Sequence, residues 1–232
     1  MGGGAKVYWN GGTRVDFPDQ GFTTQINTLI QTRYTFSDQD EDQGGENVSS
    51  FDVNNARIIL SGNAMHNEFH YMLAPDFVNN STDGEATPRL LDAVIGWRAC
   101  DWLDVQMGQF KTGISRQFNV NDWEQQFADE STVSQLFNLG RQQGASATTN
   151  WMDGAVTLGA GIFNGESDGE GINRSGVDTE HTGVVTARYN SGSINPWVEG
   201  DVDWTEDMAY SLGAAASFSN GKTALGDSEG DL

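Results

Sequence analysis

The chain has 232 residues, with 12 basic and 33 acidic side chains and a formal net charge of −21 at pH 7. This length suffices for one large β domain or two small domains. The acid excess excludes a nucleic-acid partner, because a phosphate backbone requires clustered lysine and arginine. It fits a salty environment or cationic partners and gives no information on the fold.

The single cysteine, Cys100, excludes an internal disulfide framework and a cysteine-based zinc site. No apolar segment follows residues 1–6, so we expect no signal peptide there. The longest hydrophobic run is 71–74, which excludes a membrane-spanning helix. A soluble protein or a β-barrel remains, because the alternating strands of a barrel escape hydropathy scans.

Residues 22–36 alternate strictly between two kinds of side chain. One parity consists of phenylalanine, threonine, isoleucine and tyrosine, whereas the other is mostly polar and includes Arg33. This period of two predicts a strand that is long enough to cross a membrane, which takes about 9–11 residues. Phe22 and Phe36 close the ends of the apolar face, as the aromatic girdles of membrane barrels do.

The same alternation recurs along the rest of the chain. It predicts about ten strands in total, and no convincing amphipathic helix pattern occurs outside 112–142. After 22–36, the predicted strands are 51–64, 68–77, 90–98, 103–111, 143–151, 155–163, 183–189, 196–204 and 210–219.

The connections between these strands alternate in length. Short turns on one side and long loops on the other are typical of outer-membrane barrels, whereas a soluble sandwich more often mixes lengths. Only the short segment 205–209 departs from this rule, so the pattern favours an all-β, antiparallel transmembrane β-barrel. The short connections are 64–67, 99–102, 151–154 and 190–195, and the long ones are 37–50, 78–89, 112–142 and 164–182.

Several stretches carry a family resemblance. Residues 91–98 are Leu-Asp-Ala-Val-Ile-Gly-Trp-Arg, and 101–111 are Asp-Trp-Leu-Asp-Val-Gln-Met-Gly-Gln-Phe-Lys. These segments resemble the phosphate-selective porin family (porins O and P), as do 6–12, 51–57, 130–132 and 139–144. The resemblance implies a 16-stranded outer-membrane barrel of Gram-negative bacteria, a homotrimer at full length, whose third long loop folds inward and narrows the pore.

In this chain the third long connection is 112–142, which is also the longest, so we expect an inward-folded constriction loop there. It contains Trp123 and Phe127 among acidic residues, which suggests a short helix packed against the wall.

The chain departs from the family in strand number and at its ends. It offers about ten strands instead of sixteen, and it ends in Asp231-Leu232 where family members have an aromatic-terminated strand. We therefore expect residues 1–232 to be a single outer-membrane β-barrel domain that is truncated at the C-terminus, a partial barrel. A native ten-stranded barrel is the alternative, since even strand numbers from about eight upward close.

A pore that passes anions needs fixed positive charge facing its water-filled lumen. The predicted pore-lining, anion-attracting residues are Arg33, Arg57, Arg98, Lys111, Arg116, Arg141 and Arg188. Four of these arginines, at positions 33, 57, 98 and 188, lie on the polar parity of their strands, and Arg116 and Arg141 lie in the 112–142 segment or at its ends. Lys111 is included because it matches the lysine that follows Gly-Gln-Phe in the family. Strict alternation from Met107 directs Lys111 to lipid, unless a bulge near Gly108 turns it to the lumen.

A lumen arginine is explained as well by a structural salt bridge as by anion attraction. The polar face also carries acidic side chains, namely Asp92, Asp104, Glu199, Asp201 and Asp203. Such mixed signs suit general polar solutes better than phosphate alone.

Other features do not make an enzyme or a metal site. The spaced acids Asp38, Asp40 and Asp42 lack the glycine and glutamate positions of a calcium loop. His66 and His70 fall in a turn and the following strand, and 165–171 is an acidic loop without the context of a phosphate cradle. No nucleophile–base pair stands out, so we expect no catalysis and no cofactor.

We interpret the chain as a porin of the bacterial outer membrane, in contact with lipid, for passive diffusion of small hydrophilic solutes, anions such as phosphate among them. Two alternatives remain open. One is a secreted acidic β-sandwich that binds carbohydrate, and the other is a plugged barrel with a structural or adhesive role.

Overall fold

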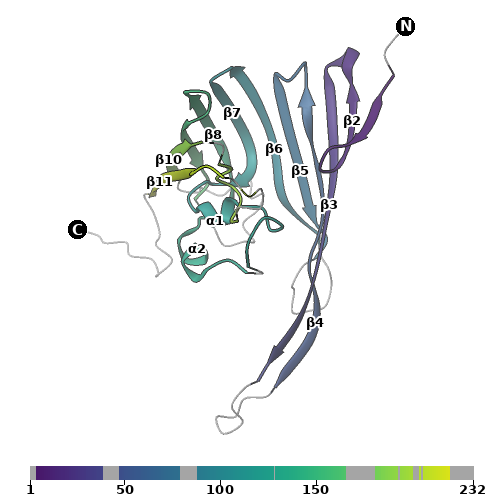
Figure 1. Ribbon diagram of the computed structural model, residues 1–232, viewed down its shortest axis with the longest axis vertical. Coiled ribbons are helices and arrows are strands. Elements are labelled where there is room, and N and C mark those ends of the chain that lie inside the picture. Colours follow the sequence, from purple (N-terminus) through teal and green to yellow (C-terminus); the bar gives the residue numbers. More distant parts are fainter. Residues whose placement is uncertain are drawn as a thin grey trace, which may run out of the picture. The chain divides into compact units, whose positions relative to one another are not determined.

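The computed structural model describes residues 4–38, 47–78, 88–127, 129–165, 181–192, 194–200, 204 and 206–219. Its eleven strands belong to one sheet, in which their order follows the chain (Figure 1). The predicted all-β, antiparallel fold is thus confirmed. In the described part of the chain, no helix has the length and apolar character needed to cross a membrane. The chain divides into two compact units, 1–93 and 94–232, which we describe separately.

The first unit is dominated by one long hairpin. β3 (Phe22–Ser37) and β4 (Val48–Ala64) have 16 and 17 residues and continue past the end of β5 (Phe69–Asp76) (Figure 1). Their register shifts between Gln31 and Thr32, so that Asn54 is an extra residue on β4, a β-bulge. The unit begins with β1 (Lys6–Trp9), β2 (Thr13–Phe17) and the 3-10 turn η1 (Pro18–Gln20).

The second unit is a series of antiparallel hairpins interrupted by two short helices. From β7 to β11, neighbouring strands pair without a register shift in the described residues. The turn between β8 and β9 holds Asp153 and Gly154 at positive φ, as the predicted hairpin requires. The elements are β6 (Arg89–Cys100), which begins before the unit boundary, β7 (Leu103–Lys111), α1 (Arg116–Asn119), α2 (Thr132–Phe137), β8 (Arg141–Trp151), β9 (Val156–Phe163), β10 (Thr182–Ser191) and β11 (Tyr210–Ser219).

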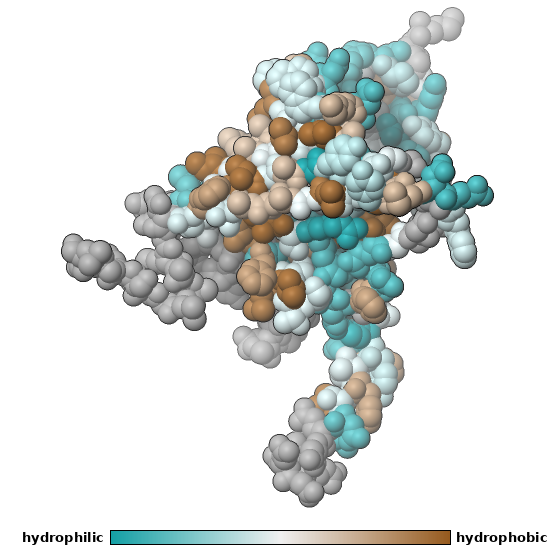
Figure 2. Space-filling view, turned by 60° about the vertical axis from the view of Figure 1, so that its left-hand side comes forward, coloured by the Kyte–Doolittle hydropathy of each residue, from teal (hydrophilic) through white to brown (hydrophobic). Residues whose placement is uncertain are grey.

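The apolar parity of the strands is the more exposed one. In β3, Ile30, Tyr34 and Phe36 are 76%, 55% and 62% exposed, whereas the side chains between them are half-buried. Figure 2 shows such hydrophobic side chains uncovered on the surface. A soluble sheet turns its apolar face to a core. The inverted arrangement is therefore the one that a lipid-facing wall needs.

Aromatic side chains gather near one end of the strands of the second unit. The ring centroids of Trp102 and Trp151 are 5.4 Å apart, and those of Tyr189 and Tyr210 are 6.1 Å apart. Trp102 and Trp151 lie at the β6–β7 and β8–β9 turns, whereas Tyr189 lies two residues before the end of β10 and Tyr210 begins β11. Amphipathic rings at one level of a membrane barrel form an interfacial girdle.

The strand predictions differ from the structure in two places. The expected strand 196–204 is absent from its described residues, where 196–200 form turns and bends. Proline at position 196 has no N–H for a ladder, and the carbonyl groups of Pro196 and Val198 bind a side chain instead. Conversely, β1 and β2 were missed because strands of 4 and 5 residues carry too little alternation to recognise.

Candidate functional site

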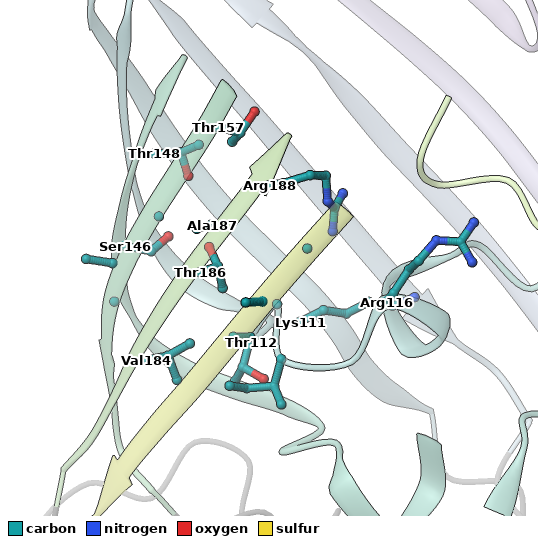
Figure 3. Close-up of a pocket in the computed structure, with 18 of the residues that line it drawn as sticks. Lys111, Thr112, Arg116, Ser146, Thr148, Thr157, Val184, Thr186, Ala187 and Arg188 are labelled. Atoms are coloured by element: carbon teal, nitrogen blue, oxygen red, sulfur yellow. The ribbon is translucent and has the colours of Figure 1, made fainter. Parts of the chain in front are cut away.

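A cavity of about 630 Å3 in the second unit is lined by the polar parity of β8 to β11. Strand register sets Asn150 opposite Thr157, and Thr157 opposite Arg188. Gly213 of β11 continues this row beyond Arg188. One row across the sheet therefore combines an amide, a hydroxyl and a guanidinium, and Figure 3 shows Thr157 and Arg188 on its lining.

Arg188 lies in this row against an aromatic ring. Its Cζ atom is 3.7 Å from the centroid of the Trp197 ring, which is a cation–π contact. A Cβ atom added to Gly213 would lie 3.7 Å from Arg188 Nε, which is ordinary van der Waals contact, so Gly213 is a direct neighbour of this side chain. Because an indole carries no formal charge, the contact holds the guanidinium without neutralising it.

Lys111, the last residue of β7, and Arg116, in the segment that follows β7, line the same cavity (Figure 3). Lys111 Nζ donates to the carbonyl of Val120 at 3.1 Å. Arg116 Nε and Nη2 donate to the carbonyls of Pro196 and Val198, each at 2.9 Å. Among the described residues that line this cavity none is acidic, so the net formal charge of the described lining is positive.

Arg141 lies next to Lys111 in the β7–β8 register. Both cations contact the ring of Phe118, at 5.1 Å from Lys111 Nζ and 5.7 Å from Arg141 Cζ. The register passes through Gly108 without a shift, so the bulge that would redirect Lys111 is absent from this pairing. Lys111 is instead the last residue of its strand and reaches the cavity from the strand end.

The 112–142 segment packs onto a small apolar core. Ile114 and Leu139 contact the buried cluster of Phe110, Phe163 and Val184. The rings of Phe110 and Phe163 meet edge to face, with centroids 5.4 Å apart. The two ends of this segment are thereby fixed against strands β7, β9 and β10.

The 112–142 segment contains two short helices, but neither includes Trp123 or Phe127, the residues from which the sequence suggested a helix. Trp123 and Phe127 are 51% and 69% exposed and lie outside both helices. Helices α1 and α2 instead begin after Ser115 and Ser131, whose hydroxyl groups accept hydrogen bonds from the backbone N–H three residues on. Serine capping therefore selects where these short helices start.

A second segment, 195–199, is hydrogen-bonded to the 112–142 segment. Besides the two bonds from Arg116, the Glu199 N–H donates to the carbonyl of Glu124 at 3.3 Å. The Glu199 carboxylate accepts from the Gln126 N–H at 2.8 Å. The segment thus brings Trp197 to the cavity, a contact that the sequence prediction missed because it treated 196–204 as a strand.

Arg33 and Arg57 belong to the first unit and have polar partners. Arg57 Nε is 2.9 Å from Asp76 Oδ2, and Asp76 is 1% exposed. Arg57 Nη2 also donates to Asn55, and Arg33 Nη2 donates to the bulged Asn54 at 2.6 Å. Arg57 is thus an ion-pair partner, as the structural alternative predicted.

Arg98 belongs to the second unit and does not line the cavity. Its Nε lies 4.0 Å from Asp104 Oδ2, and the side chains are 45% and 27% exposed. This is a long, solvated ion pair.

The remaining predicted features fall in different places. Asp201 and Asp203 lie outside the described residues, as do Asp40 and Asp42, which do not fit a calcium loop, and most of 165–171. No cluster of metal-binding side chains occurs among the residues that the structure describes. His66 lies in the β4–β5 turn and His70 in β5, as expected.

Comparison with known families identifies the class of protein. Residues 26–197 match the family of phosphate-selective porins O and P. The chain therefore belongs to this porin family, a family of outer-membrane channels and not of enzymes. A comparison with curated proteins found no match.

Proposed function

We propose that the cavity is part of a water-filled pore through which small hydrophilic solutes diffuse passively, with a preference for anions. The observation that carries this proposal is the lining itself, which combines Lys111, Arg116 and Arg188 with small polar side chains and, in the part of the chain that the structure describes, contains no carboxylate. Fixed positive charge beside a low-dielectric wall raises the local concentration of anions and lowers that of cations.

The 112–142 segment serves as the constriction of this pore. Its residues Thr112, Gly113, Ile114 and Arg116 line the cavity, while Ile114 and Leu139 anchor it to the strands. An anchored loop narrows a lumen without closing it, so selection is by size and charge and involves no covalent step. Phosphate is one candidate solute, and the full-length protein acts as a homotrimer in the outer membrane of a Gram-negative bacterium.

Conductance measurements test this function. The full-length protein, reconstituted in planar lipid bilayers, should give stepwise ohmic currents, and its zero-current potential in a salt gradient should show anion preference. A plugged structural barrel would give no steps, and a soluble carbohydrate-binding sandwich would stay in solution without detergent. Cation preference would contradict the role of the three basic lining residues.

A further inference from the structure

We propose that this cavity binds an organic anion that carries hydroxyl groups, a sugar acid, more tightly than it binds inorganic phosphate or a neutral sugar. The inference rests on the proposed function, because it takes the cavity as part of the solute path. It adds the chemical class of the preferred solute.

The cationic side of the cavity suits a carboxylate. Arg188 stacks on Trp197 through the flat face of its guanidinium, at 3.7 Å. Guanidinium N–H groups lie in the plane of the group, so a stacked arginine still presents its edge to a planar, bidentate partner. Lys111 and Arg116 donate to backbone carbonyls and contribute mainly their charge.

The neighbouring side chains suit sugar hydroxyls. In the row of Arg188, the Thr157 hydroxyl donates to Asn150 Oδ1 at 3.0 Å. In the next row, the Ser211 hydroxyl donates to Asn190 Oδ1 at 2.7 Å. Each pair combines amide N–H donors with a hydroxyl oxygen acceptor, which is the mixed pattern that a polyhydroxylated molecule requires.

The size of the cavity points the same way. Its volume of about 630 Å3 lies within the range of small-molecule sites, so a lone phosphate ion would leave most of it to water. Gly159 and Gly161 leave the floor of the cavity free of side chains. A Cβ atom at Gly159 would lie 2.5 Å from Thr186 Oγ1, and one at Gly161 would lie 2.7 Å from Phe163 Cε2. The indole of Trp197 supplies an apolar surface for the carbon skeleton of a sugar.

Blocking of the single-channel chloride current measures this preference. We compare D-glucuronate, which has charge and hydroxyls, with acetate, glucose and inorganic phosphate, each titrated against the full-length protein in planar bilayers. Glucuronate should reduce the current at about tenfold lower concentration than any of the other three solutes. Only glucuronate has both a carboxylate for the basic side chains and several hydroxyl groups for the neighbouring polar pairs.

Matched variants show how much of the glucuronate block depends on the polar side chains and how much depends on the basic ones. Thr157→Val keeps the shape and should weaken the glucuronate block roughly threefold, because a single neutral hydrogen bond is lost, while leaving the acetate block nearly unchanged. Arg188→Gln should weaken glucuronate, acetate and phosphate together. Thr28→Val, on the exposed parity of β3 and away from the cavity, is the control and should change none of these values.

Two results overturn the inference while the proposed function stands. The first is a channel that conducts and prefers anions but is blocked by phosphate at a lower concentration than by glucuronate. The second is such a channel in which glucuronate blocks no better than acetate. A protein that gives no ohmic steps contradicts the proposed function itself, and with it this inference.

Discussion

Two parts of the chain hold arginine on the polar parity of a strand in opposite settings. In the first unit, Arg57 forms an ion pair with the buried Asp76, which cancels its charge. In the second, Arg188 lies on Trp197, and Lys111 and Arg141 share Phe118. The ring of Trp197 positions the guanidinium of Arg188 without cancelling its charge. The residue that an arginine contacts therefore decides its role: a carboxylate partner makes it a stabilising part of the strand wall, whereas an aromatic partner leaves its charge available to the lumen.

The largest effect should follow from breaking the ion pair of the first unit. Asp76→Ala leaves Arg57 without its carboxylate in a site where the two side chains are 1% and 12% exposed. We expect the free energy of unfolding to fall by about 3 kcal/mol, because an uncompensated buried charge remains. Urea unfolding in detergent measures this loss. Asp16→Asn, in the more exposed pair with Arg14, is the control and should lower the free energy of unfolding far less than Asp76→Ala does.

The second prediction addresses the charged wall. Arg188→Gln should lower the anion-to-cation permeability ratio roughly threefold, because it removes a full charge from a lining whose described residues include no carboxylate. The zero-current potential in a salt gradient measures this ratio. High salt should shrink the difference between the variant and the parent protein, since it screens fixed charges. An unchanged ratio at low salt would contradict this role.

A smaller effect is expected at the ring that two cations share. Phe118→Ala removes the contacts to Lys111 and Arg141 and should lower the free energy of unfolding by about 1 kcal/mol. Phe118→Tyr keeps the aromatic face and should retain most of this stability. Equal losses in the two variants would contradict a stabilising role for the aromatic face of residue 118.

The smallest effect is expected at Arg98. Asp104→Asn removes the carboxylate of a pair that is 4.0 Å apart and partly exposed, so stability should change by less than about 0.5 kcal/mol. If both side chains face the lumen, the variant should prefer anions slightly more than the parent, as measured by its zero-current potential. A shift toward cations would contradict that orientation.

Strand parity was sufficient to predict much of the wall. The alternation in 155–163 and 183–189 separates the cavity residues Thr157, Gly159 and Thr186 from the outward side chains. The overall acidity was a poor guide to this site, because it averages over the chain, whereas the lining residues that the structure describes include no carboxylate. Local parity therefore carries more information about this site than net charge does.

The partners of the arginines were harder to predict, because they depend on register and on loops. The pairing of Arg57 with Asp76 follows from the β4–β5 register once the turn at 64–67 is known. The contact of Trp197 with Arg188 has no such signal, since it depends on how 195–199 binds the 112–142 segment. Tertiary contacts of irregular segments leave no periodicity to recognise.

One comparison tests the central claim most directly, namely that ion-paired arginines stabilise the wall while aromatic-paired arginines select anions. The zero-current potential is measured in the same salt gradient for Arg188→Gln and for the double variant Arg57→Gln/Asp76→Asn, which removes a cancelled pair without changing net charge. We predict that the single variant shifts toward cations and that the double variant matches the parent protein. Equal shifts in both variants would contradict the claim.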